Sequence, residues 1–109
     1  MAIKANIIID QGSDFITTLN VSDDDGYAIN LTGYTGAAQM RRHYTSVSKY
    51  DFVVTVNAAT GEVSMAMDSE LTNSIPAGRY VYDCELTDSS GVKSRIVEGI
   101  VTVTPQVTR

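Results

Sequence analysis

The side chains with the most obvious capacity for catalysis are a single histidine and a single cysteine. His43 directly follows Arg41 and Arg42 at the end of an expected strand. A nucleophilic site needs a serine or cysteine held by a neighbouring base, and a histidine beside two arginines is a poor base. Cys84 lies among hydrophobic residues, where a free cysteine packs as a small apolar side chain. We therefore expect His43 on a surface loop, Cys84 in the core, and no enzymatic activity.

The acidic run Asp23-Asp24-Asp25 is the strongest candidate for metal binding. Calcium takes several oxygen ligands, but the run lacks the spacing of an EF-hand loop, which ends in a glutamate. Aspartates also favour turns, and Gly26 follows the run. We expect a solvated turn here, with a weak cation site as the alternative, and no cofactor.

Basic and aromatic side chains alternate around the middle of the chain. Arg41, Arg42 and Lys49 are interleaved with Tyr44 and Tyr50. Such residues can stack on nucleic-acid bases, and tyrosine and arginine are also enriched at protein interfaces. The net charge of -5 disfavours binding to phosphates. The segment predicts a protein-binding surface formed by Arg41, Arg42, Tyr44 and Tyr50, and a loop that binds nothing is the remaining alternative.

Length and composition favour one globular domain over residues 1–109. A chain with 43% hydrophobic and 19% charged residues is too apolar for disorder. One cysteine excludes an internal disulfide. The apolar run at 7–9 is too short for a secretion signal, and no run is long enough to span a membrane. We expect synthesis in the cytoplasm, no export and no membrane contact.

Segments of alternating polarity, separated by turn residues, recur at intervals of about ten residues. One or two helical turns are expected to begin at 68–71, before Pro76 and Gly78. Otherwise the pattern predicts an all-β fold, an immunoglobulin-like antiparallel β-sandwich of seven to eight strands. The expected strands are 3–9, 14–22, 27–31, 34–42, 52–56, 63–67, 80–86 and 93–104.

The alternation also predicts which side chains point inward. Ile96 and Ile100 fall on the opposite face of the last strand, which suggests a β-bulge near Gly99. The small residues Gly36 and Ala37 suggest that something packs closely against them. The predicted inner face comprises Phe15, Thr17, Leu19, Val21, Ala38, Met40, Phe52, Val54, Val56, Val63, Met65, Met67, Tyr80, Tyr82, Cys84, Leu86, Val97, Gly99, Val101 and Val103.

Residues 75–105 form the expected central hairpin, whose first strand contains Tyr82 two residues before Cys84. Immunoglobulin-like domains have a tyrosine at that spacing, and its hydroxyl anchors a corner of the chain. The partner cysteine and the buried tryptophan of antibody domains are missing. The similarity is therefore to the sandwich in general, with Tyr82 as the expected anchor.

Seven segments together carry a resemblance to a known family. The chain resembles the small immunoglobulin-like structural proteins of tailed bacteriophages and prophages, and it is similar to the N-terminal domain of baseplate upper proteins. It departs from the latter by ending after one domain. The segments are DQGSDF (10–15), NLTGY (30–34), TGE (60–62), PAGRYVYD (76–83), RIVEG (95–99), VTP (103–105) and VTR (107–109).

The resemblance implies a non-enzymatic virion component, made in the host cytoplasm, that serves as a tail, baseplate or neck adaptor. Its partners would be other virion proteins and copies of itself. Exposed sheet edges can pair with another chain. We expect Ile3, Ile7 and Ile9 to lie in such an edge or docking tail, so that deleting residues 1–10 leaves a folded but assembly-deficient domain.

Two alternative functions remain open. One is a capsid decoration protein. The other is a carbohydrate-binding or adhesion module for a host surface, for which Tyr27, Tyr34, Tyr44 and Tyr50 could supply exposed aromatic rings.

Overall fold

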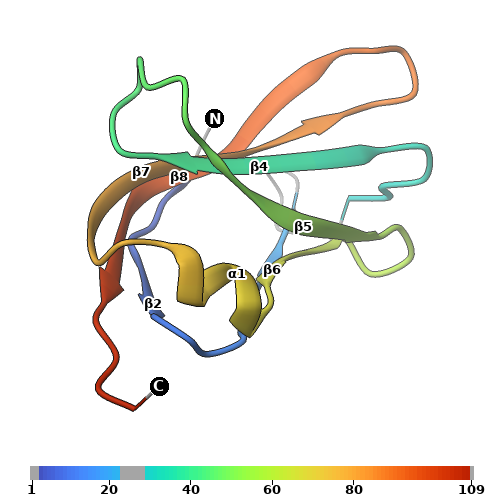
Figure 1. Cartoon of the computed structure of the whole chain (residues 1–109). Coiled ribbons are helices and arrows are strands. Elements are labelled where there is room, and N and C mark those ends of the chain that lie inside the picture. The colour runs from blue at the N-terminus through green and yellow to red at the C-terminus, as the bar shows by residue number, and fades with distance from the viewer. Residues whose placement is uncertain (1–2, 23–28, 109) are drawn as a thin grey trace.

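Eight strands and one short helix make up the computed structural model over the residues that it describes, 3–22 and 29–108 (Figure 1). The aspartate run and the first two residues of the expected strand 27–31 lie outside these residues, and 29–31 are not in a strand. The elements are β1 (Ile3–Lys4), β2 (Ile7–Asp10), β3 (Phe15–Asn20), β4 (Thr35–Arg41), β5 (Tyr50–Asn57), β6 (Glu62–Met67), α1 (Ser69–Ser74), β7 (Gly78–Thr87) and β8 (Lys93–Thr104).

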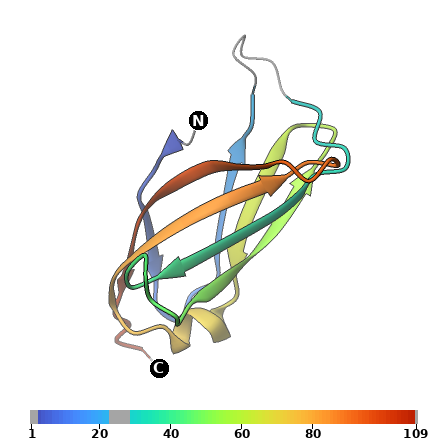
Figure 2. The same cartoon turned by 90° about the horizontal axis from the view of Figure 1, so that it is seen from above.

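The strands form a single sheet in the order β1-β8-β7-β4-β5-β6-β3, with β2 also paired to β8. Strand β5 joins the two halves: its first residues pair with β4, and its pairing from Val53 onward is with β6. The sheet therefore curls, and β5, β6 and β3 form a second layer across from β8, β7 and β4 (Figure 2). The prediction of an all-β, sandwich-like fold with seven to eight strands is confirmed.

The N-terminal strands correct one part of that prediction, because the sheet is mixed and not purely antiparallel. Both β1 and β2 run parallel to β8, with Ile3 opposite Val97 and Ile9 opposite Val103. After β2 the chain crosses to the other layer to begin β3, so no hairpin turn forces β2 to be antiparallel to its neighbour.

The core lies between the two layers, and the predicted inner face supplies most of it. The inward side chains of β3 and the later part of β5 are only partly buried, because β3 lies at an open sheet edge. Ile9, Leu31 and Ile75 are also fully buried although the alternation did not assign them. The predicted residues that are buried are Ala38, Met40, Phe52, Val63, Met65, Met67, Tyr80, Tyr82, Cys84, Leu86, Val97, Val101 and Val103.

The β-bulge in β8 lies at Ile96 and not near Gly99. Cys84 pairs with Val97, whereas the next residue of β7, Glu85, pairs with Arg95, so Ile96 is the extra residue. This one-residue insertion turns Arg95 to the outer face, where strict alternation from Val97 would have placed it inside.

Two glycines mark places where chain segments approach closely. A Cβ atom added at Gly36 would overlap Cγ1 of Val54, which confirms the expected close packing at this position. A Cβ atom at Gly99 would overlap the carbonyl oxygen of Ala5, in the link between β1 and β2. Gly99 therefore allows the N-terminal segment to lie against β8.

The helix α1 closes one end of the curled sheet, between β2 and β6 (Figure 1). Asp68 caps it by accepting a hydrogen bond from the Leu71 N–H at 2.9 Å. The buried Thr72 hydroxyl donates to the Ser13 carbonyl at 2.8 Å and accepts from the Gly12 N–H at 3.1 Å. The predicted one or two helical turns are confirmed. Among the described residues, no helix has the length and apolar character needed to cross a membrane.

Two buried tyrosines anchor the chain through their hydroxyl groups. Tyr80 donates to the Pro76 carbonyl at 2.6 Å, and Tyr82 donates to the Ala5 carbonyl at 2.6 Å. The corner before β7 is thus held by Tyr80 and not by Tyr82, because Tyr80 is the inward residue nearer to the turn. Tyr82 instead holds the N-terminal segment against the sheet.

Candidate functional site

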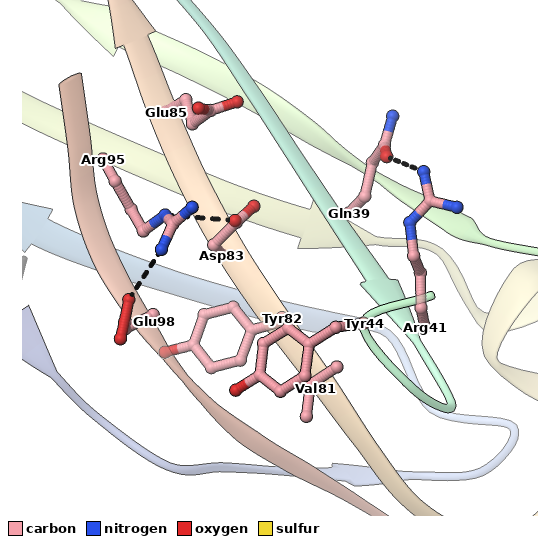
Figure 3. Close-up of a pocket in the computed structure, with 9 residues that line it drawn as sticks. All are labelled: Gln39, Arg41, Tyr44, Val81, Tyr82, Asp83, Glu85, Arg95 and Glu98. Atoms are coloured by element: carbon pink, nitrogen blue, oxygen red, sulfur yellow. Dashed lines mark hydrogen bonds and ion pairs between the residues drawn. The ribbon is translucent and has the colours of Figure 1, made fainter. Parts of the chain in front are cut away.

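A hollow of about 220 Å³ lies on the outer face of β4, β7 and β8. Its lining combines ion-paired charges, an amide and a tyrosine ring from the loop after β4 (Figure 3). The residues that line it are Gln39, Arg41, Tyr44, Val81, Tyr82, Asp83, Glu85, Arg95 and Glu98.

Strand register brings the polar side chains of this hollow together. On β4 and β7 the outward residues have odd numbers, and Gln39 lies directly opposite Asp83. Asp83 in turn lies opposite Glu98 on β8. Because the bulge turns Arg95 outward, it reaches both carboxylates: its Nε is 3.3 Å from Asp83 Oδ2, and its Nη1 is 3.1 Å from Glu98 Oε2 (Figure 3).

The electrostatics of the hollow are governed by this three-residue network. Burial raises the pKa of Asp83, and the positive charge of Arg95 opposes that rise. The hydrogen bond to Glu98 raises the pKa of Arg95, followed by the charge of Asp83, so the guanidinium stays protonated. On the other wall, Arg41 donates to Gln39 Oε1 at 2.9 Å and to the Ser46 carbonyl at 2.6 Å.

The lining of this hollow is suited to recognition. It includes no serine, cysteine or histidine that could act as a nucleophile or base. Its carboxylates and guanidinium groups can exchange ion pairs and hydrogen bonds with a partner, and Tyr44, which is 84% exposed, can pack flat against one. The described residues contain no group of three His, Cys, Asp or Glu side chains arranged to hold a metal ion.

The structure divides the predicted basic and aromatic surface between two hollows. Arg41 and Tyr44 line the hollow on the outer face. Arg42 and Tyr50 line a second hollow of about 420 Å³ beneath the loop that joins β4 to β5. Arg41 is the last residue of β4 and Arg42 lies just beyond it, and their side chains line different hollows, so the two arginines do not belong to one flat surface.

In the second hollow, Arg42 and Tyr50 pack around Tyr80. The Arg42 guanidinium carbon lies 4.6 Å from the centre of the Tyr80 ring, and the Tyr50 ring meets Tyr80 edge-on at 6.1 Å. These contacts support the corner before β7. Lys49 pairs with Asp51 at 2.9 Å, and His43 is exposed on the loop as predicted.

The three isoleucines predicted to contact a partner, Ile3, Ile7 and Ile9, lie in different environments. Ile3 is exposed and Ile7 is half-buried, and both line a third hollow of about 210 Å³ that faces β3. Ile9 is fully buried in the core. The prediction that Ile9 is available to a partner is therefore wrong, since the inward face of β2 covers the space between the two layers.

Cys84 is buried in the core, as predicted. Burial, with smaller contributions from the charges of Asp83 and Glu85, raises the pKa of its thiol to about 11. A reactive thiolate needs a lowered pKa and an open setting. Cys84 is therefore a packing residue.

The raised pKa of Cys84 predicts a loss of stability in alkali. The unfolded thiol ionises near pH 9 and the folded one near pH 11, so stabilisation by the neutral thiol is complete below about pH 9 and is lost as pH rises to about 11. The expected loss is about 2 kcal/mol of unfolding free energy. Urea unfolding across this range should show a steeper decline for the wild type than for Cys84→Ala. Equal slopes would contradict the prediction.

The sequence pattern did not identify four charged residues of the outer hollow as site residues: Asp83, Glu85, Arg95 and Glu98. The outward positions of β7 could have been read from the alternation around Tyr80, Tyr82 and Cys84. The outward orientation of Arg95 could not be predicted from alternation, because it depends on the position of the β-bulge.

The sequence matches no protein-family model and no curated protein. The structure is similar to that of the Listeria monocytogenes internalin-like protein lmo2027, with a TM-score of 0.51 and 15% sequence identity. The similarity covers 94% of this chain and only 28% of that one. At this identity the comparison shows a shared all-β, sandwich-like fold, and a fold of this kind carries many functions.

Proposed function

We propose that this domain is a non-enzymatic structural protein of a tailed-bacteriophage virion that acts through protein contacts as a tail, baseplate or neck adaptor. The proposal rests on the family resemblance of seven segments along the chain and on one surface feature. Its partners are other virion proteins, and its place of synthesis is the host cytoplasm.

The surface feature is an apolar row across the outer face of β3, β6 and β5. Ile16 lies opposite Ala66, and Ala66 lies opposite Val53. Ile16 is 70% exposed and Val53 is 66% exposed, although each is a large hydrophobic residue on a regular strand. The row therefore presents adjacent apolar side chains to solvent on three paired strands.

Contiguous exposed apolar surface with a polar border is typical of protein-binding sites. Here the border on one side is the next row of the sheet, formed by Thr18, Ser64 and Thr55. Ile16, Ala66 and Val53 line none of the three hollows described above, whereas a second protein surface could cover them. This arrangement supports binding to a protein over binding to a small molecule.

The proposal is tested by peptide mass spectrometry of purified particles. The wild-type protein is expected in particles at a constant ratio to the major structural proteins. Val53→Ser is expected to remain folded but to be depleted from particles, since it makes the apolar row polar. Absence of the wild-type protein from particles would overturn the proposal.

The matched control for this experiment is Val92→Ser. Val92 is 60% exposed, close to the value for Val53, but it lies at the turn between β7 and β8. Its incorporation should equal that of the wild type. Equal depletion of both variants would mean that the row on β3, β6 and β5 is not the docking surface. Cryo-electron microscopy of the same particles separates the adaptor from the alternative of a capsid decoration protein, which would lie on the shell.

The exposed ring of Tyr44 favours a second candidate function, a host-surface carbohydrate-binding module. Tyr44 borders the outer hollow together with Gln39 and Asp83, and sugar sites combine aromatic rings with amide and acidic groups. Tyr34 is half-buried, and Tyr27 lies outside the described residues. Calorimetric titration with glycans would show binding that Tyr44→Ala abolishes, and no binding by the wild type would exclude this function for the glycans tested.

A further inference from the structure

We infer that two copies of this chain pair through the free edge of β3, which makes β5, β6 and β3 of each copy one half of a continuous six-stranded sheet. This goes beyond the proposed function, because the dimer is expected whether or not the domain belongs to a virion. Three features support this pairing: the backbone register of β3, the lack of charged residues, proline and glycine in residues 15–20, and the side chains that would meet.

Within residues 3–22 and 29–108, strand β3 is paired with another strand on one side only. It pairs with β6 over its whole length, from Phe15 opposite Met67 to Asn20 opposite Glu62, and it ends the strand order of the sheet (Figure 2). Its inward side chains remain partly exposed, whereas the inward residues of β6 are buried. No described segment therefore covers this edge.

The register decides which backbone groups point outward at the free edge. In an antiparallel pair, every second residue bonds to a given neighbour. The Val21 N–H donates to the Gly61 carbonyl at 2.8 Å, in continuation of the register between β3 and β6. Phe15, Thr17 and Leu19 therefore bond to β6. The three alternate residues of the strand, Ile16, Thr18 and Asn20, direct their N–H and C=O groups away from it.

These three residues are symmetric about Thr18. When a second β3 approaches antiparallel with Thr18 opposite Thr18, Ile16 lies opposite Asn20 of the other copy at both ends. All outward N–H and C=O groups of both strands are then paired. An antiparallel register in which Ile16 faces Ile16, or Asn20 faces Asn20, leaves some of these outward N–H and C=O groups without a partner in the other β3. The contact is isologous, as a two-fold dimer requires.

The edge carries none of the features that protect sheet edges from pairing. Residues 15–20 (FITTLN) include no charge, proline or glycine, and the register with β6 is continuous without a bulge. The opposite edge of the sheet is different: β1 and β2 are short, the chain between them breaks the pairing with β8, and they contain Lys4 and Asp10. Of these edges, β3 is the one open to a long partner strand.

The side chains that meet in this register are compatible. On the inner face, Phe15 faces Val21 of the other copy, and Thr17 faces Leu19. Phe15, Leu19 and Val21 are partly exposed hydrophobic residues at the border of the core. Pairing with a second copy would bury them further and join the cores of the two copies. On the outer face the central pair is Thr18 with Thr18, a favourable cross-strand pair. An uncharged strand also avoids local repulsion between two chains of net charge -5.

The hollow beside the edge adds contact area. It is about 210 Å³, and Thr17, Thr18 and Leu19 form one wall while Ile3 and Ile7 form the other. Two paired strands and this hollow still make a small interface compared with stable dimers. The dimer is therefore expected to dissociate on dilution.

The decisive variant is Thr18→Lys. Analytical ultracentrifugation of the wild type is expected to show reversible association to twice the monomer mass of 11.8 kDa. Thr18→Lys places two like charges opposite each other at the two-fold axis and should weaken association about tenfold or more. The Thr18 side chain is exposed, and its hydroxyl forms a solvent-exposed hydrogen bond with the Ser64 hydroxyl at 3.1 Å, so the thermal midpoint of the monomer should hardly change.

The control is Thr55→Lys. Thr55 lies opposite Ser64, which lies opposite Thr18, so it is exposed in the same row of the same face but two strands away from the edge. Thr55→Lys adds the same charge as Thr18→Lys and should leave association unchanged. A wild type that stays monomeric at its highest soluble concentration would overturn the inference, as would equal effects of the two lysine variants.

A charge-swap experiment tests the register itself. Thr18→Lys and Thr18→Glu should each be monomeric, and a mixture of the two should form a heterodimer, because residue 18 meets residue 18 of the partner. Amide hydrogen exchange gives a second measure. The amides of Ile16, Thr18 and Asn20 should gain protection as concentration rises, whereas those of Thr17 and Leu19 should be protected throughout. No heterodimer, or protection independent of concentration, would refute pairing centred on Thr18.

Discussion

A chain that lacks residues 1–10 is expected to be unfolded. The deletion removes β1 and β2, and with them Ile9, which is fully buried against the core, and the Ala5 carbonyl that accepts the Tyr82 hydroxyl. It also exposes the edge of β8, whose Val101 and Val103 pair with β2. Circular dichroism and urea unfolding would show the loss of the cooperative transition.

This outcome differs from what the sequence predicts, which is a folded domain that fails only in assembly. The sequence prediction treated 3–9 as a detachable strand, whereas the structure uses its inward side as part of the core. A deletion product with a native spectrum and a cooperative transition would show that the sequence prediction is right after all.

Two single substitutions at neighbouring positions test whether the deletion destabilises the domain through lost core packing and not merely through a shorter chain. Ile9→Ala should lower the unfolding free energy by about 3 kcal/mol, because it leaves a cavity in a fully buried site. Ile8→Ala removes the same atoms from a side chain that is 66% exposed, and it should cost less than about 0.5 kcal/mol. Equal effects would mean that β2 is not docked as the structure shows.

The second large effect is expected from Gly99→Ala, which should lower the unfolding free energy by about 3 kcal/mol. A methyl group there overlaps the carbonyl oxygen of Ala5 and lies 2.8 Å from its carbonyl carbon. Because the clash is with backbone, no side-chain rotation relieves it, and the N-terminal segment must move away from β8. A glycine-to-alanine change without such a clash would instead be slightly stabilising.

A double-mutant cycle shows whether the N-terminal segment is what moves. In the wild type, Tyr82→Phe removes the hydrogen bond to Ala5 and should cost about 1 kcal/mol. In the Gly99→Ala background that bond is already lost, so Tyr82→Phe should cost clearly less. The control Ile100→Val makes a smaller change at the next residue of β8, which is 40% exposed, and should cost less than about 0.5 kcal/mol. Additive effects of Gly99→Ala and Tyr82→Phe would contradict the proposed displacement.

Local pattern was sufficient to predict most of the strands and their inward faces. Met40, Met65 and Tyr80 point into the core as the alternation required, because one side of each strand faces the other layer. The short helix was also predictable, since Asp68 is a capping residue and Pro76 follows closely.

The candidate sites depended on information that the sequence pattern does not contain. Arg41 and Tyr44, two residues of the predicted protein-binding surface, line the outer hollow, but other charged residues there, Asp83 and Glu98, come from other strands. Arg95 faces these two carboxylates only because the bulge falls at Ile96. A bulge can be accommodated at several positions of a long hairpin, and packing between layers selects one of them.

The sequence by itself determined an all-β chain whose strands each bury one face, because alternation is a local property of neighbouring residues. The tertiary structure alone decided that β1 and β2 run parallel to β8, that Ile9 is core, and that β3 is left with an open edge. Which strands become neighbours depends on contacts between residues far apart in the chain. For that reason, no local pattern reveals which sheet edge remains free for a partner.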